Sequence, residues 1–142
     1  MSADSKTVLI TGATRGIGLT FVEYYLNAGG KVVSTARNLD GAFVPLKKSY
    51  YDNTTLPNGH MYSYRASKCA LNMINSCLAV DLKSDNIIAI VLQPGYVNTE
   101  PTYGNGVVQP VNSVAGMTKV IASVTTDDTA KFFDFQAPEL PW

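Results

Sequence analysis

The sequence predicts an α/β fold built on parallel strands. Three observations predict it. First, residues 7–28 contain an apolar run followed by a glycine-rich turn and a helical pattern. Second, residues 62–82 are amphipathic, and third, residues 87–92 form a continuous aliphatic run. The chain has 142 residues, of which 46% are hydrophobic and 15% charged. This composition is typical of a globular protein, and the length predicts one domain over 1–142.

The amino-terminal part predicts a complete β-α-β unit. Residues 7–11 are expected to form a short buried strand, and residues 16–28 a helix that Gly29-Gly30 ends. Residues 31–36 are rich in β-branched side chains and predict a second strand. The connection between the two strands should be right-handed.

From residue 38 to residue 60 the pattern is broken by glycines and prolines. Residues 42–46 are compatible with a short extended piece, but Pro45 argues against a central strand.

The helix expected over 62–82 has two apolar stripes, so we expect it to pack on two sides. One stripe contains Ala66, Ala70, Met73, Cys77 and Val80, and the other Leu71, Ile74, Leu78 and Leu82.

The rest of the chain predicts one buried strand, a loop, a helix and a last strand. The run over 87–92 is typical of a strand buried in a parallel sheet, and Pro94-Gly95 ends it. A loop over 100–110, a weaker amphipathic helix over 111–123 and a strand over 131–135 follow.

Charge and composition exclude several classes of partner. The formal net charge is zero and no basic stretch is present, which argues against nucleic acid. The longest aliphatic run is too short to cross a membrane, and the first residues are polar, so we expect no secretion signal. Cys69 and Cys77 are eight positions apart on one expected helix, too far for a disulfide, so we expect free thiols and a cytoplasmic location. His60, the single histidine, has no ligand-spaced neighbours, and we expect no metal site.

The turn Thr11-Gly12-Ala13-Thr14-Arg15-Gly16-Ile17-Gly18 is the strongest indication of function. A glycine-rich turn between a strand and a helix holds a dinucleotide pyrophosphate on backbone N–H groups. Gly12 would permit the tight turn, Gly16 the approach of phosphate, and Gly18 the close packing of helix and strand. The alternative is an ordinary turn whose glycines serve conformation only.

Two arginines favour NADP(H) over NAD(H). Arg15 lies inside the turn, and Arg37 stands where a carboxylate would usually meet a ribose 2′-hydroxyl. A guanidinium pairs well with a 2′-phosphate and poorly with a diol. Alternatively, both arginines are ordinary surface residues.

Tyr64 and Lys68 are one helical turn apart and project from the same face. A nearby ammonium favours the phenolate form of a tyrosine, so the pair could move a proton to or from a carbonyl oxygen. The alternative is a solvated helix face.

Together these motifs resemble the short-chain dehydrogenase/reductase family. Thr11-Gly12-x-x-x-Gly16-x-Gly18, Tyr64-x-x-x-Lys68 and Pro94-Gly95-x-Val97-x-Thr99 occur in the family's order. The segment 64–73 and the ending 139–142 are similar to the cell-contact-factor-like and sniffer-type carbonyl reductases. The resemblance covers roughly residues 6–37 and 49–142.

The resemblance implies a role for each matched residue. Tyr64 would be the general acid, and Lys68 would bind the nicotinamide ribose. The backbone near Pro94, Gly95 and Val97 would hold the nicotinamide ring, with Thr99 near the carboxamide and phosphates. The residues that would bind the cofactor are Gly12, Thr14, Arg15, Gly16, Ile17, Gly18, Arg37, Lys68, Pro94, Gly95, Val97 and Thr99. The loop 100–110 would lie over a small-molecule carbonyl substrate, and the helix 62–82 would form a dimer interface.

The chain departs from the family by a large internal deletion. Two to three β-α units between the second strand and the tyrosine helix are missing, at about 30 residues per unit. The serine that polarises the carbonyl is unmatched, since Pro45 falls at its place and Ser49 just beyond it. The implied fold is therefore a reduced Rossmann-like, doubly wound parallel sheet missing central strands. The strand 87–92 moves beside the first strand, or residues 42–46 fill part of the gap, or the chain folds poorly alone.

Two functions remain open. The first is an NADP(H)-dependent oxidoreductase that reduces a carbonyl compound. The second is a catalytically inactive splice form or remnant that binds nucleotide weakly or forms a homodimer or a heterodimer with a full-length relative through residues 62–82. A small α/β domain with coincidental motifs is a third, less specific interpretation.

Overall fold

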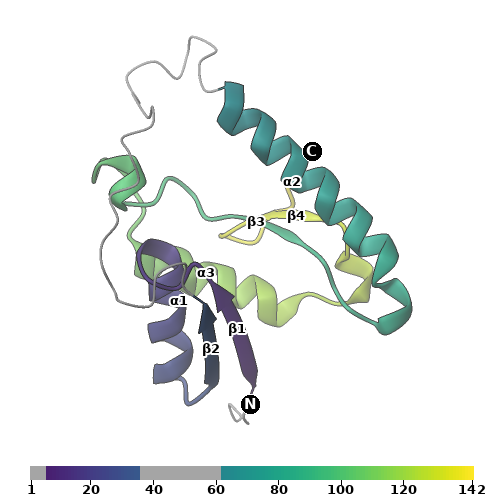
Figure 1. Ribbon diagram of the computed structural model, residues 1–142, viewed down its shortest axis with the longest axis horizontal. Coiled ribbons are helices and arrows are strands. Elements are labelled where there is room, and N and C mark those ends of the chain that lie inside the picture. The colour runs from purple at the N-terminus through teal and green to yellow at the C-terminus, as the bar shows by residue number, and fades with distance from the viewer. Residues whose placement is uncertain (1–5, 36–61) are drawn as a thin grey trace. The chain divides into compact units, whose positions relative to one another are not determined.

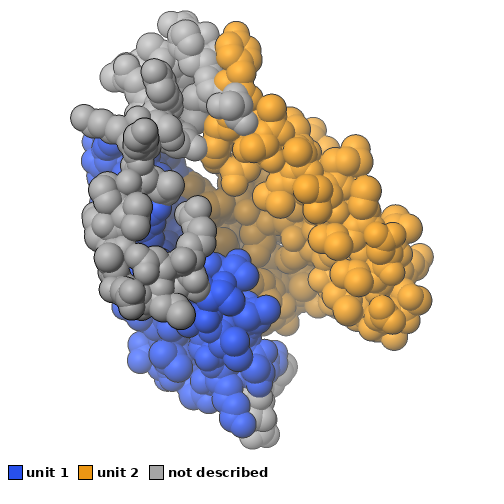
Figure 2. Space-filling view, viewed as in Figure 1, with its two compact units in different colours: residues 1–49, 96–115 blue, residues 50–95, 116–142 orange. Residues whose placement is uncertain are grey.

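The computed structural model describes residues 6–35 and 62–142, which belong to two compact units (Figure 2). Unit 1 comprises residues 1–49 and 96–115, and unit 2 comprises residues 50–95 and 116–142. Each unit contains a pair of parallel strands together with helices, so the predicted α/β class is confirmed. The single domain over 1–142 stays a prediction.

Unit 1 begins with the predicted β-α-β unit. Strand β1 (Thr7–Thr11), helix α1 (Gly16–Asn27) and strand β2 (Lys31–Thr35) follow in order, and α1 packs against both strands (Figure 1). The strands are parallel and pair from Thr7 with Lys31 to Thr11 with Thr35. Gly29 ends the helix with a φ of 78°, a value that glycine adopts without strain. These bounds confirm the sequence prediction to within one residue over the described residues.

The second part of unit 1 is a closed loop that leads into a helix. Val97 and Val108 form a parallel bridge at the base of this loop, and the Asn98 N–H donates to the Val108 carbonyl at 2.8 Å. A short 3-10 helix, η3 (Glu100–Thr102), lies within the loop. Helix α3 (Pro110–Ser123) follows, and it begins in unit 1 and ends in unit 2.

Unit 2 contains helix α2 (Tyr62–Asp81), strand β3 (Val91–Gln93) and strand β4 (Phe132–Asp134), with the 3-10 helices η2 (Lys83–Asp85) and η4 (Thr126–Asp128). β3 and β4 are parallel and lie side by side in Figure 1. The carboxyl-terminal part of α3 approaches the end of β4 closely, because a Cβ atom at Gly116 would collide with the Phe135 carbonyl oxygen.

The sequence predicts a strand over 87–92, but the strand in the structure begins later and is shorter. Only Val91–Gln93 form a strand, and its partner β4 has three residues. Ahead of the strand, the Ala89 N–H donates to the Thr129 hydroxyl at 3.2 Å and the Ala89 carbonyl accepts from Ala130 at 2.8 Å. Within unit 2 this strand pairs with β4; residues 42–46 lie outside the described residues.

The burial of α2 differs from the prediction that both apolar stripes pack. The buried residues are Asn75 and Ala79, and the Asn75 amide donates to the Ala89 carbonyl at 3.4 Å. The large apolar side chains are exposed: Leu71, Met73, Ile74, Leu78 and Val80, with Met73 65% and Val80 74% accessible. A stripe is buried only where another element covers it, and a pair of three-residue strands covers little of a twenty-residue helix.

No helix within residues 6–35 and 62–142 combines the length and the apolar character needed to cross a membrane. Cys69 and Cys77 both carry free, exposed thiols.

Candidate cofactor-binding site

The glycine turn between β1 and α1 has the backbone conformation that the sequence predicts. Gly12 and Gly16 have φ values of 66° and 52°, in the left-handed region that favours glycine. At Gly18 a Cβ atom would collide with the Gly12 carbonyl oxygen, so helix and turn are in contact at their backbones. The Ala13 N–H donates to the Thr35 carbonyl at 3.3 Å and ties the turn to β2.

The amino end of α1 can accept an anion. Arg15 is the N-cap, with extended backbone angles, and its side chain makes no capping hydrogen bond. The first turn, which starts with Gly16 and Ile17, contains no acidic residue. The first N–H groups of an α-helix have no partner within the helix, and the helix dipole favours negative charge there. Backbone donors at such a helix end suit a phosphate, and phosphate binding at this turn stays a prediction.

Thr99 lies beside this turn within unit 1. A Cβ atom at Gly16 would be 3.6 Å from the Thr99 side-chain methyl, an ordinary van der Waals contact. Thr99 also closes the amino end of η3, where its N–H donates to the Thr102 hydroxyl at 3.0 Å. Val97, two residues earlier, is buried. The structure thus brings together the predicted phosphate-binding turn and the predicted residue Thr99, 83 positions after Gly16 in sequence.

The Arg15 side chain is paired with a carboxylate that the sequence analysis missed. The Arg15 Nη1 atom donates to Glu100 Oε2 at 2.6 Å, and the two side chains are 33% and 45% exposed. Glu100 directly follows Thr99 in the segment that resembles a cofactor-binding motif, which is the one local sign of its importance. No sequence periodicity links residues 85 positions apart, so only the folded chain reveals the pair.

Tyr64 and Lys68 lie together on the first turns of α2, in unit 2. The Lys68 Nζ atom is 5.3 Å from the centroid of the Tyr64 ring. Ser67 donates to the Tyr64 carbonyl at 2.7 Å within the same helix, and the Tyr64 side chain is exposed. The helical spacing therefore brings the predicted pair together.

The other predicted site residues are divided between the units. Pro94 and Gly95 follow β3 in unit 2, and Gly95 has a φ of 79°. Thr14 is exposed in the glycine turn of unit 1. Arg37, Pro45 and Ser49 lie outside the described residues, as does His60. Within residues 6–35 and 62–142, no three side chains of the metal-ligating types come together.

The sequence matches one family model and several known proteins. A family model described as short chain dehydrogenase matches residues 52–109. The C-signal protein of Myxococcus xanthus is 35% identical over 85 residues, which cover 60% of this chain and 51% of that protein. The 1-hydroxy-2-glutathionyl-2-methyl-3-butene dehydrogenase of Rhodococcus sp. (strain AD45) is 32% identical over 121 residues, covering 82% and 49%. The chain thus spans about half the length of these relatives.

Solved structures show the same fold. An NADPH-bound carbonyl reductase from chicken fatty liver matches with a TM-score of 0.74 and 19% identity, over 97% of this chain and 99% of that chain. The carbonyl reductase Sniffer of D. melanogaster matches with a TM-score of 0.74 and 16% identity, over 97% and 100%. At these identities the likeness concerns the fold, a Rossmann fold of which this chain has a shortened form. With a glycine turn after β1, a Tyr64–Lys68 pair on α2 and sequence relatives of this kind, the chain belongs to the short-chain dehydrogenase family.

Proposed function

We propose that this chain is an NADP(H)-dependent oxidoreductase that reduces a carbonyl compound, with residues 1–142 acting as one shortened dinucleotide-binding domain. The observation that carries the proposal is the turn at the start of α1, where Gly18 contacts the Gly12 backbone and no side chain caps the helix. Backbone donors at such a turn fit a pyrophosphate. Family membership supports a nicotinamide cofactor, and the NADPH-bound carbonyl reductase of the same fold supports the phosphorylated form.

The proposed cofactor contacts come from several segments. The pyrophosphate would lie on the backbone of the glycine turn, and the guanidinium groups of Arg15 and Arg37 would receive the 2′-phosphate. Lys68 would bind the nicotinamide ribose. The remaining contacts would come from Gly12, Thr14, Gly16, Ile17, Gly18, Pro94, Gly95, Val97 and Thr99.

The proposed chemistry assigns the proton to Tyr64. A reduced nicotinamide supplies the hydride when it is bound. The Tyr64 hydroxyl would hold the carbonyl oxygen by a hydrogen bond and donate its proton as negative charge develops there. Lys68, which lies over the Tyr64 ring, would place its positive charge beside the tyrosine as the proton leaves.

Calorimetric titration of the purified 142-residue chain with NADPH tests the first half of this proposal. Binding with one site per chain is expected, and the absence of binding contradicts the proposal. Consumption of NADPH in the presence of small aldehydes and ketones tests the second half. A chain that binds NADPH and consumes none with any carbonyl compound is a nucleotide-binding protein and not a reductase.

A second candidate function is favoured by the surface of α2. The large apolar side chains of this helix are exposed, and the chain spans about half the length of its curated relatives. Exposed apolar patches of this kind mark protein–protein contacts. The chain would then be catalytically inactive, bind nucleotide weakly, and form a homodimer or a heterodimer with a full-length relative through α2.

Sedimentation analysis tests the dimer, whereas carbonyl reduction by the purified chain would contradict the inactive form. Ile74→Glu and Met73→Glu should convert a dimer into a monomer, whereas Arg65→Glu, at an exposed polar position of the same helix, should leave it intact. A monomer at all concentrations, with and without a full-length relative, contradicts the dimer.

We also propose a cytoplasmic location, because the exposed thiols of Cys69 and Cys77 suit a reducing compartment.

A further inference from the structure

We propose that Glu100 is a specificity-determining residue that competes with a cofactor 2′-phosphate for the Arg15 guanidinium, and so lowers the preference for NADP(H) over NAD(H). The inference rests on the proposed function, since it concerns the same nucleotide site. It goes further because it predicts that removing one carboxylate strengthens NADP(H) binding selectively.

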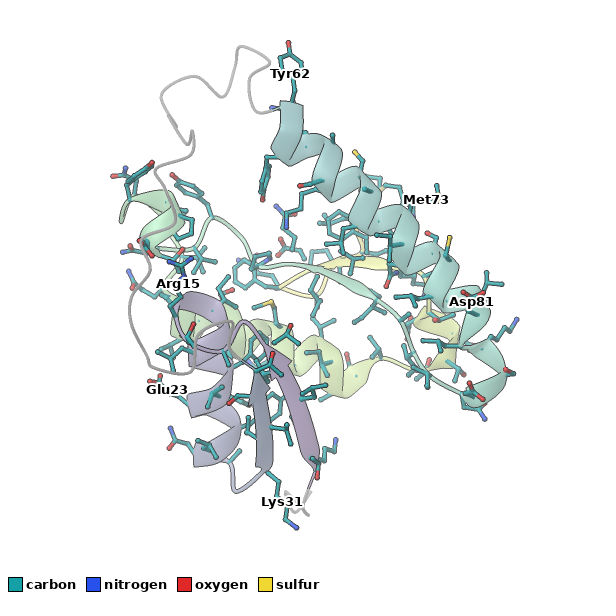
Figure 3. All side chains as sticks on the ribbon, viewed as in Figure 1. Arg15, Glu23, Lys31, Tyr62, Met73 and Asp81 are labelled. Carbon is teal, nitrogen blue, oxygen red and sulfur yellow. The ribbon has the colours of Figure 1, made fainter. Side chains whose placement is uncertain are left out.

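Arg15 is positioned by the backbone at the junction of turn and helix. Its carbonyl accepts the Leu19 N–H at 3.2 Å, as an N-cap residue does, and its side chain makes no capping bond. Figure 3 shows Arg15 at one end of α1 and Glu23 farther along the same helix. Arg15 therefore belongs to the end of the helix where the backbone donors for phosphate are.

Glu100 is held by a network of hydrogen bonds around η3. The Thr102 hydroxyl lies 2.8 Å from both the Val97 and the Thr99 carbonyl oxygens and accepts the Thr99 N–H. The Tyr103 N–H donates to the Glu100 carbonyl at 2.9 Å. These contacts fix the backbone of Glu100 beside the glycine turn, where Thr99 already contacts Gly16.

The Arg15–Glu100 bond uses the guanidinium that a 2′-phosphate would need. At 2.6 Å it is a short, charge-assisted hydrogen bond. A bound 2′-phosphate must displace the carboxylate from Arg15, and breaking this ion pair costs affinity. A ribose with a free 2′-hydroxyl has no such requirement. Glu100 therefore penalises NADP(H) and leaves NAD(H) unaffected.

The test measures the dissociation constants of NADPH and NADH for the full 142-residue chain and for Glu100→Gln. We expect NADPH to bind about two- to fivefold more tightly to the variant, the range that an exposed ion pair supports, and NADH to bind equally to both. Glu23→Gln is the matched control. It removes the same charge from an exposed position of α1 and should not change the ratio of the two constants.

A second comparison separates competition from a merely structural effect. In an Arg15→Gln background, Glu100→Gln should bring no gain in NADPH affinity, because the guanidinium for which it competes is absent. A gain that persists in that background, or unchanged or weaker NADPH binding by Glu100→Gln alone, overturns the inference.

Adenosine 2′,5′-bisphosphate and AMP distinguish failure of this inference from failure of the proposed reductase. If the bisphosphate binds more tightly to Glu100→Gln and AMP does not, the competition is real even when no carbonyl compound is reduced. If NADPH and the bisphosphate both fail to bind the wild-type chain, the cofactor site and the competition are both wrong.

Discussion

The Lys68 ammonium nitrogen lies over the ring of Tyr64, 5.3 Å from its centroid. This distance is within the range of a cation–π contact, which orients the lysine toward the tyrosine before any ligand is bound. One helical turn separates the two residues, so the contact needs no support from distant parts of the chain. The spacing along α2 thus brings together the two side chains of the proposed proton-transfer pair.

Tyr64→Phe should abolish carbonyl reduction, with a loss of about 10²- to 10⁴-fold, while NADPH binding is retained. The substitution removes the proton donor and keeps the ring over which Lys68 lies. Tyr62→Phe is the control, since Tyr62 is an exposed tyrosine on the same helix (Figure 3). Steady-state rates and calorimetric titration provide the two measurements. Turnover that survives in Tyr64→Phe would exclude Tyr64 as the acid.

Gly18→Ala should destabilise unit 1 by about 1–3 kcal/mol, because the new methyl group would collide with the Gly12 carbonyl oxygen. Gly29→Ala is the comparison. Its φ of 78° makes alanine strained by about 1–2 kcal/mol, but no atom lies within 4 Å of the added carbon. Urea denaturation of both variants gives the free energies of unfolding. An unchanged free energy for Gly18→Ala would contradict the close contact between helix and turn.

Thr102→Val should lower the free energy of unfolding by about 1–2 kcal/mol, because it leaves the Thr99 N–H without its hydroxyl acceptor. Thr102→Ser keeps the hydroxyl, so its free energy of unfolding should fall by less. Thermal denaturation of the two variants, followed by circular dichroism, measures the difference. Equal losses would mean that the methyl group of Thr102, and not its hydrogen bonds, supports η3.

The stability of unit 2 should fall at low pH in a way that depends on Asp128. The Lys131 hydrogen bond, the Thr125 N–H and the Thr125 hydroxyl lower the pKa of Asp128 from its ordinary 3.8 to about 2. The folded state therefore binds its proton later than the unfolded state on acidification. The stabilisation is complete above the unfolded pKa and is lost as the pH falls through about 2.

Asp128→Asn should remove this contribution, so the urea midpoints of wild type and variant should differ at neutral pH and converge toward pH 2. Asp127→Asn, in the same 3-10 helix, removes a charge but not the Asp128–Lys131 hydrogen bond of 2.8 Å. The urea midpoint of this variant should therefore still fall as the pH approaches 2, as expected for the wild type. A gap between wild type and Asp128→Asn that is independent of pH would contradict the assignment.

The local part of the fold could be predicted from the sequence. Strands β1 and β2 and helix α1 are marked by short-range features: β-branched runs, the glycine turn and Gly29-Gly30. The contact between Tyr64 and Lys68 follows from helical spacing in the same way.

The predictions that were wrong or missing concern contacts between residues that are distant in sequence. The length of β3 is limited by the three-residue strand β4, and the run over 87–92 carries no information about it. The apolar stripes of α2 predict burial only if another element covers them, and Met73 and Val80 remain exposed. Glu100 was missed because its partner Arg15 is 85 positions away. Residue pattern determines which elements form, whereas tertiary contacts determine which of their faces are used.

Neither of the two small sheets has an interior strand within the described residues. Along β1, successive amide groups point alternately toward β2 and away from it. Amide hydrogens that point toward β2 exchange slowly with solvent deuterium, and their neighbours exchange fast. We therefore expect protection along Thr7–Thr11 to be periodic, because the described residues provide β1 with a strand partner on one edge.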